Sequence, residues 1–288
     1  ILHSIRRFFR ERDYLEVDTP ILIPAPAPES HIDAIACGFQ YLQTSPELCM
    51  KRLLAAGYPR LFQICRCFRE AERGTRHLPE FTLLEWYAQG KDYLFLMEEC
   101  EALLRFLAVT LYGKEEITFQ GSRIDLSAPW ERLSVNEAFL RYGGISARQT
   151  LAEDIFDEVL VSRIESRLGI ERPTFLYDYP VELAALARAK PNDPSLAERF
   201  ELYLAGIELA NAFSELIDPV EQSRRFEEAQ QQRRALGKSP YPWPERFLRA
   251  LSAMPPSTGI ALGIDRLVML MTDRAFIDDV VAFPPERL

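Results

Sequence analysis

Histidine and closely paired cysteine, the residues that most often build metal centres and disulfide frameworks, are scarce in this sequence. Its 288 residues include only 3 histidines and 5 cysteines, and no two cysteines form a Cys-x-x-Cys pair. Structural zinc sites and disulfide frameworks both depend on such clusters, so we expect neither. Cys65 and Cys67 are spaced to fill one tight face of a strand as small apolar side chains.

Long apolar runs and an excess of positive charge are also missing. No stretch of 18 apolar residues occurs, and the N-terminus lacks a signal-peptide pattern, so we expect a cytoplasmic protein that does not enter a membrane. The 34 lysines and arginines are outnumbered by 43 aspartates and glutamates, and the net charge is -9. Proteins that grip nucleic acid over a broad surface are normally basic, so this class is disfavoured. The 48% of hydrophobic residues fits a globular chain with a sizeable core.

What the sequence does contain is a pronounced hairpin pattern in its first third. Two apolar-rich segments, Leu61–Phe68 and Phe81–Tyr87, flank a polar stretch at Glu70–Leu78. This pattern predicts two long antiparallel strands joined by a loop. Side chains alternate along a strand, so Glu85 shares a face with the aromatic residues at both ends of its segment. A carboxylate there is costly if it is buried alone, which indicates a polar cavity over this face.

The hairpin also carries a group of cations beside an aromatic ring. Arg69 ends the first strand, Arg73, Arg76 and His77 stand in the loop, and Phe81 opens the second strand. An aromatic ring stacks on a nucleobase and guanidinium groups bind phosphates, so the set suits a nucleotide. The alternative is an exposed hairpin with solvated charges. That alternative is the better interpretation of one arginine, but not of the whole set.

A helix start is indicated at Ser45-Pro46-Glu47. Serine is a favoured N-cap and proline suits the first helical position, so we expect a helix that runs to about Gly57. Glu47 then lies in the first turn, where an acid complements the positive end of the helix.

The segment Arg199–Leu216 predicts a strand that brings polar side chains toward the hairpin. Glu208, Asn211 and Glu215 follow one another within eight residues. Two acids near a phosphate-binding hairpin have two plausible roles, which are coordination of magnesium and retention of a cationic substrate. Acids on a solvated strand face are the alternative, which fits Glu201 better than the others.

A third segment, Thr258–Met271, predicts a short apolar strand that turns at Gly263 into a helix. Arg266 falls in the first turn of that helix, where it reinforces the positive field that attracts phosphate. Glycine at the turn allows a ligand to approach the backbone closely.

Together these segments resemble the motifs of class II aminoacyl-tRNA synthetases over nearly the whole chain. Phe68-Arg69, Arg76–Thr82 and Glu85-Trp86-Tyr87 are similar to motif 2, and Gly263–Arg266 is similar to motif 3. The lysyl branch is the best match. Within it, the Leu-Glu-Trp-Tyr ending of motif 2 and Ala261 resemble the lysyl-tRNA synthetase paralogues that attach (R)-β-lysine to elongation factor P.

The resemblance implies a class II synthetase catalytic fold of the α+β class, with a mostly antiparallel sheet flanked by helices. It implies one catalytic domain over residues 1–288, with an insertion at about 114–172 and no anticodon-binding domain. A helix at residues 1–12 and a strand at 14–22 are similar to motif 1, the dimer-forming element of the family, so a homodimer is implied. Apolar spacing predicts a further helix at residues 150–168.

The resemblance also implies a reaction. ATP, with Mg²⁺ as cofactor, would activate (R)-β-lysine or lysine as an adenylate, and the amino acid would pass to a lysine side chain of elongation factor P. Catalysis is assigned to Arg69 on the α-phosphate, Arg266 on the γ-phosphate, and Glu208 as the metal ligand.

The implied binding residues form two sets. The ATP-binding set is Arg69, Glu70, Ala71, Arg76, His77, Leu78, Phe81, Glu208, Leu209, Gly263 and Arg266. The amino-acid set is Ser45, Pro46, Glu47, Glu85, Tyr87, Asn211, Glu215 and Ala261.

Three positions depart from the family pattern. Ala71 stands where a glutamate is usual, Leu78 replaces an asparagine, and Ala212 replaces a glycine. Two alternatives therefore stay open: a free-standing enzyme of the lysyl-tRNA synthetase type, and an inactive paralogue with a regulatory role. A tRNA substrate is not expected under the main interpretation.

Overall fold

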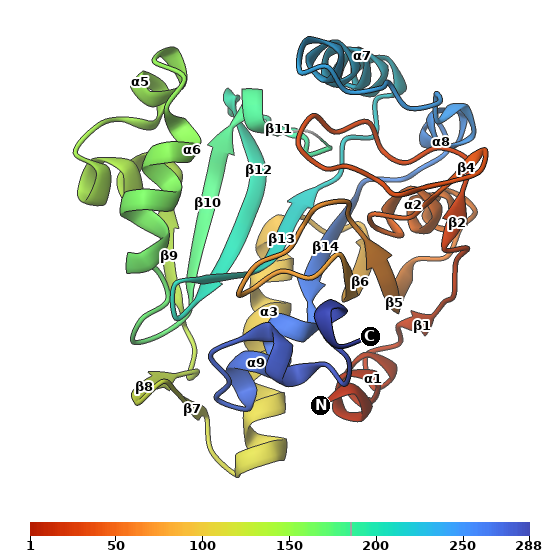
Figure 1. Ribbon diagram of the computed structural model, residues 1–288. Coiled ribbons are helices and arrows are strands. Elements are labelled where there is room, and N and C mark those ends of the chain that lie inside the picture. The colour runs from red at the N-terminus through yellow and green to blue at the C-terminus, as the bar shows by residue number, and fades with distance from the viewer. Residues whose placement is uncertain (185) are drawn as a thin grey trace.

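The computed structural model describes residues 1–184 and 186–288, and a large twisted sheet runs through it (Figure 1). Within the described residues this sheet has nine strands. Eight follow one another in the order β1 (Leu15–Glu16), β5 (Arg60–Phe68), β6 (Glu80–Gln89), β14 (Ser257–Gly263), β13 (Ile207–Ser214), β12 (Asp193–Leu204), β10 (Thr174–Pro180) and β9 (Glu131–Ser134). The ninth, β11 (Ala189–Lys190), pairs with β12.

Strand direction confirms the α+β class. Every pairing from β5 to β10 is antiparallel, and only the two edge pairings, β1 with β5 and β9 with β10, are parallel. The sheet is therefore mostly antiparallel, as expected.

The predicted hairpin is present and slightly longer than expected. β5 and β6 pair from Arg60 opposite Ala88 to Phe68 opposite Glu80. In this register Gln63 lies opposite Glu85, so the polar faces of the two strands coincide. The opposite face of β6 carries Trp86, which is fully buried.

That opposite face packs on the main hydrophobic core. Helices α1 (Leu2–Arg10), α3 (Tyr93–Tyr112) and α9 (Ile264–Met271) supply apolar side chains to one cluster with the central strands. α3 begins at Asp92, whose side chain accepts from two backbone N–H groups, and ends at Gly113 in the left-handed conformation. The core therefore fixes β6 from behind and leaves the face with Glu85 free to carry a site.

Further helices surround the other face of the sheet. α2 (Glu47–Ala55), α7 (Pro219–Ala235) and α8 (Glu245–Leu251) lie at one end, and the segments that follow β9 lie beside β9 and β10 on the left of Figure 1. The remaining elements are β2 (Leu22–Ile23), β3 (Ala36–Cys37), β4 (Gln40–Leu42), β7 (Glu116–Phe119), β8 (Ser122–Asp125), α4 (Val135–Ala138), α5 (Ala147–Ala152), α6 (Phe156–Val159), and the short π or 3₁₀ turns η1 (Phe139–Gly143), η2 (Leu160–Ile164), η3 (Glu165–Arg167), η4 (Val181–Leu183), η5 (Ile277–Val280) and η6 (Pro285–Arg287).

Two local predictions were wrong in their extent. The helix expected at residues 150–168 is broken, because Asp154 adopts a left-handed backbone with φ of 56° between α5 and α6. The strand expected at 14–22 is only two residues long, and Pro20 lies between β1 and β2. In addition, β9 lies within the expected insertion but is an edge strand of the main sheet.

Candidate active site

A cavity of about 1420 Å³ lies over the face of the sheet that carries Glu85. Its floor comes from β6, β12, β13 and β14, and its walls come from the β5–β6 loop, from α7 and from the segment around α6. Most of the predicted site residues line it: Ser45, Glu47, Arg69, Arg76, His77, Leu78, Phe81, Glu85, Tyr87, Glu208, Leu209, Asn211, Ala261, Gly263 and Arg266. Sites for single small molecules are smaller, so the cavity has room for two substrates side by side.

Four predicted residues lie off the cavity wall. Glu70 and Ala71 are exposed on the β5–β6 loop, Pro46 is buried as the N-cap of α2, and Glu215 is buried beside Gly259 and Lys51. Ala71 has a left-handed backbone with φ of 59°, so it helps to shape the loop. The expected N-cap was therefore one residue too early, although Ser45 Oγ still accepts from the backbone N–H of Glu47 at 3.0 Å.

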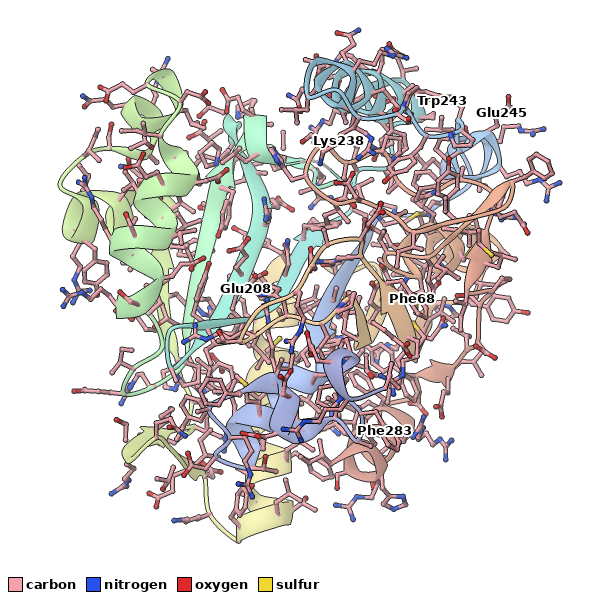
Figure 2. All side chains as sticks on the ribbon, viewed as in Figure 1. Phe68, Glu208, Lys238, Trp243, Glu245 and Phe283 are labelled. Atoms are coloured by element: carbon pink, nitrogen blue, oxygen red, sulfur yellow. The ribbon has the colours of Figure 1, made fainter. Side chains whose placement is uncertain are left out.

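One end of the cavity is organised by Arg266. Its guanidinium donates to the backbone oxygen of Glu208 at 2.6 Å and to that of Arg76 at 3.2 Å, and so connects β13 to the β5–β6 loop. In Figure 2, Glu208 lies near the centre of the view, where this loop crosses the sheet. Arg266 Nη2 also lies 2.6 Å from Nε2 of His77. Because arginine only donates, His77 accepts through Nε2 and is neutral; burial, and then Arg266, lower the pKa of His77.

Arg69 and Phe81 stand on the neighbouring part of the wall. The guanidinium of Arg69 lies 5.0 Å from the centroid of the Phe81 ring. Arg69 Nε is buried and has no hydrogen-bond partner within the described part of the chain. A donor left unpaired in this position is suited to an anionic oxygen, and the ring beside it to a base.

Arg73 does not join these cations, contrary to expectation. It forms ion pairs with Asp278 and Glu286, both at 2.8 Å, and it does not line the cavity. The backbone N–H of Ile277 adds a bond of 3.0 Å to the oxygen of Thr75. The C-terminal segment therefore anchors the tip of the β5–β6 loop.

A second acidic residue, Glu201, accompanies Glu208. The sequence left a solvated strand face open for Glu201, but this residue is buried on β12 and lines the cavity. It accepts from Tyr179 at 2.6 Å and from Tyr203 at 2.8 Å, and pairs with Arg199 at 2.7 Å. Burial, and then the charge of Glu208, raise the pKa of Glu201. The alternation of charged and apolar residues around Phe200 was the signal for this face.

The opposite end of the cavity is built from hydroxyls and carboxylates. Glu85 accepts from Ser45 Oγ at 2.6 Å and from Tyr87 Oη at 2.8 Å, and Glu47 lies on the adjacent start of α2. Burial, and then the charge of Glu47, raise the pKa of Glu85 to about 7, against the hydrogen bonds from Ser45 and Tyr87. The arrangement offers acceptors to ammonium groups.

A buried cation that the sequence did not single out stands behind this end. The side chain of Lys51 on α2 is 1% exposed, and its ammonium pairs with Glu47 and, at 2.5 Å, with Glu215. Burial lowers the pKa of Lys51, but the carboxylates of Glu215 and Glu47 outweigh burial and raise it. The spacing of four residues from Glu47 was the available signal.

Glycine is required at position 259 in the floor. A Cβ added to Gly259 would lie 2.2 Å from Cε1 of Tyr87 and 2.4 Å from Oε1 of Glu215. Both distances are far below van der Waals contact, so the glycine allows these two side chains to meet on the cavity face of β14. This residue and Glu29, whose pKa burial raises to about 7, also line the cavity and were missed from the sequence.

The acidic residues suit a hard cation only in part. Among residues 1–184 and 186–288 no group of three or more His, Cys, Asp or Glu side chains could hold a metal ion. Mg²⁺ is often held by one or two carboxylates together with substrate phosphates, and Glu208 and Glu201 fit that smaller role. No helix in the same residues is long and apolar enough to cross a membrane.

Comparison with known proteins agrees with this geometry. The family model for class II tRNA synthetases (D, K and N) matches residues 1–287. The chain is 40% identical to the elongation factor P--(R)-beta-lysine ligases of Vibrio atlanticus and Proteus mirabilis, over all of this chain and 94% and 93% of those relatives.

A second group of relatives is longer. The chain is 38% identical to the lysine--tRNA ligase of Moorella thermoacetica, over all of this chain but only 64% of that enzyme. Both the 40% sequence identity over the full chain and the family model over residues 1–287 assign the chain to one family. The chain belongs to the family of class II tRNA synthetases (D, K and N).

Proposed function

We propose that this chain is an ATP-dependent ligase that activates (R)-β-lysine, or lysine, and transfers it to a lysine side chain of elongation factor P. One observation carries the proposal: a single cavity has the cations Arg69 and Arg266 on one part of its wall and the carboxylates of Glu47 and Glu85 on another. A triphosphate bound beside a diamino acid requires this division of charge. Relatives of matching length that bear this ligase name support the choice of acceptor.

In the first step a carboxylate oxygen of the amino acid attacks the α-phosphorus of ATP. A bond forms between that oxygen and phosphorus, the bond to the bridging β-phosphate oxygen breaks, and pyrophosphate leaves with the electron pair. Arg69 would hold the α-phosphate, Arg266 the γ-phosphate, and Phe81 the adenine. Because the substrate supplies the nucleophile, the protein contributes positioning and charge stabilisation.

In the second step the ε-amine of the acceptor lysine attacks the carbonyl carbon of the adenylate. An amide bond forms, the bond from carbon to the phosphate oxygen breaks, and AMP leaves. The acceptor nitrogen loses a proton as its charge is neutralised.

Selectivity for a diamino acid follows from the acceptors at the far end. Glu47, Glu85 and Tyr87 would face the ammonium groups, and Glu215 Oε1 is buried without a hydrogen-bond partner among the described residues. An apolar amino acid would leave these groups unpaired, which disfavours its binding. Ala261 lies opposite Glu85 in the β6–β14 pairing, where its methyl group would reshape the pocket for a β-amino acid.

Mg²⁺ would neutralise phosphate charge during the first step. Glu208 would be its main protein ligand and Glu201 a second, with phosphate oxygens completing the set. Arg266 already connects to Glu208 at 3.4 Å through its carboxylate, so the cation and the guanidinium would act on the same phosphates.

The quaternary structure, the acceptor and the compartment are part of the same proposal. Exposed apolar side chains at Leu15, Ile21 and Leu22, in the segment that follows α1, support a homodimer through the N-terminal segment. A monomer in sedimentation analysis would contradict this.

An enzyme that modifies elongation factor P would work in the cytoplasm, and tRNA is not its expected acceptor. The identity to lysine--tRNA ligases favours tRNA charging as the second candidate.

The first test is ATP–pyrophosphate exchange with lysine and (R)-β-lysine, for the wild type and for Arg69→Ala. Loss of the Arg69 guanidinium should slow ATP–pyrophosphate exchange by about two to three orders of magnitude. Arg66→Ala is the matched control, since Arg66 lies on the same strand but is exposed. Near-normal exchange by Arg69→Ala would remove Arg69 from the site, and tRNA charging by the wild type would favour the second candidate.

A further inference from the structure

We infer that Lys51 is a positioning residue that sets the charge of the amino-acid pocket. Its ammonium lies behind the wall and pairs with Glu47 on one side and with Glu215 on the other. It is 1% exposed and does not line the cavity, so it acts on a substrate only through these two carboxylates. The inference rests on the proposed function and adds the origin of selectivity for a diammonium substrate.

The charge count explains why a buried lysine is useful there. Three carboxylates, of Glu47, Glu85 and Glu215, converge on this end of the cavity, and Lys51 offsets one of them. In the chain without substrate, burial and Glu47 raise the pKa of Glu85 to about 7, so Glu85 still holds part of a proton near pH 7. When lysine or β-lysine binds, its two ammonium groups favour ionisation of the remaining two carboxylates, and the charges then match. Three carboxylates without a partner in a buried pocket would not all stay ionised, because like charges in a desolvated site retain protons.

The other groups around Lys51 make it hard to replace. The rings of Phe213 on β13 and Phe247 on α8 lie 5.1 Å and 6.0 Å from its ammonium. From β6, the titratable groups that face the same two carboxylates are Glu85 and Tyr87. Removal of the cation therefore leaves Glu47 and Glu215 among acids, a phenol and aromatic rings.

The carboxylate of Glu215 shows what its ion pair with Lys51 achieves. The ammonium of Lys51 forms an ion pair with Oε2 of Glu215, and neither oxygen of this buried carboxylate has a hydrogen-bond partner in the described residues. Lys51 thus orients this carboxylate so that Oε1 lies next to Gly259 and Tyr87, which line the cavity. On α2 the same ammonium fixes the carboxylate of Glu47 at the wall.

The test compares Lys51→Met with Lys51→Arg in amino-acid-dependent exchange over a range of pH. Without the cation a carboxylate keeps its proton to higher pH, so the KM of Lys51→Met for lysine should rise about tenfold or more at pH 7. The KM of Lys51→Met for lysine should fall back toward the wild-type value as the pH is raised. The curve of KM against pH is then displaced to higher pH than that of the wild type. Lys51→Arg should keep the wild-type profile, and the KM for ATP should not change in either variant.

Controls separate this role from a structural one. Lys190→Met removes another lysine that pairs with a carboxylate, Asp178 at 2.5 Å, but lies off the cavity. It should leave the KM for lysine and its pH profile unchanged. If Lys51→Met lowers thermal stability without displacing the pH profile, or if Lys51→Arg behaves like Lys51→Met, the inference is wrong.

A stability measurement tests the inference without relying on activity. Lys51→Met leaves an unpaired buried carboxylate, so the double variant Lys51→Met/Glu215→Gln should unfold at a higher temperature than Lys51→Met. Equal or lower stability of the double variant would overturn the pairing. If the wild type shows no exchange with any lysine isomer, the proposed function fails, whereas this comparison still decides whether Lys51 balances Glu215.

Discussion

Gly259 shows how one missing side chain determines the shape of the pocket. Tyr87 and Glu215 approach each other on the cavity side of this glycine, and each would lie within 2.5 Å of a Cβ at this position. The tyrosine ring is buried and has little room to move. A methyl group would therefore displace the acceptors at the amino-acid end and leave the ATP end as it is.

We predict that Gly259→Ala lowers kcat/KM for lysine about 100-fold, because a shift of about 1 Å in a positioning group has effects of this size. Steady-state exchange with varied lysine and varied ATP gives the two KM values. The KM for ATP serves as the internal control and should stay near the wild-type value. Equal loss toward both substrates would show that the substitution unfolds the site.

Glu85 makes stability depend on pH. Its folded-state pKa of about 7 lies above the ordinary value of 4.5, so the folded chain holds a proton that the unfolded chain has released. The unfolding free energy should therefore fall as the pH rises from about 5 to 8. The share from Glu85 is up to about 3 kcal/mol.

Glu85→Gln should remove this share and make the decline shallower. Urea unfolding of both proteins at pH 5 and pH 8 measures it. Parallel decline in the wild type and the variant would contradict the raised pKa of Glu85.

At the scale of elements, the β5–β6 loop is held by the C-terminal segment. Arg73 pairs with Asp278 and Glu286, while Arg266 reaches the loop backbone at Arg76. The β5–β6 loop, which would bind phosphate under the proposed function, is therefore tied to two later parts of the chain. Since the pairs of Arg73 are exposed, their effect is on the order of the loop more than on global stability.

Arg73→Ala should increase hydrogen exchange over residues 70–78 and raise the KM for ATP about two- to fivefold. Arg123→Ala, which breaks an exposed ion pair with Glu116, is the control. If hydrogen exchange over residues 70–78 is the same in Arg73→Ala and the wild type, the C-terminal segment does not order this loop.

Elements with a strong local signal were predictable from sequence. The hairpin followed from alternation on both sides of a polar stretch. The break at Asp154 between α5 and α6 was not predictable, because an aspartate in the left-handed backbone conformation has no distinct sequence signal. The position of β9 at the sheet edge depends on a parallel pairing with β10, which is a tertiary contact.

At the scale of the whole molecule, the sheet brings together segments far apart in sequence. β6, β14 and β13 are adjacent, so Glu85, Ala261 and Asn211 lie in one row across three strands. Sequence motifs identified these residues but not the buried residues that pack against the site and hold its side chains in place. Lys51, Glu201 and Gly259 act through packing and ion pairs that exist only in the folded chain.

The central claim is that the two ends of one cavity join an amino acid to ATP and then to a protein amine. Its most direct test is the intact mass of elongation factor P after incubation with this protein, ATP, Mg²⁺ and (R)-β-lysine. The account predicts a gain of one lysyl residue on a lysine side chain, absent when ATP is omitted. No gain in mass, under conditions where ATP–pyrophosphate exchange proceeds, would contradict the transfer to this acceptor.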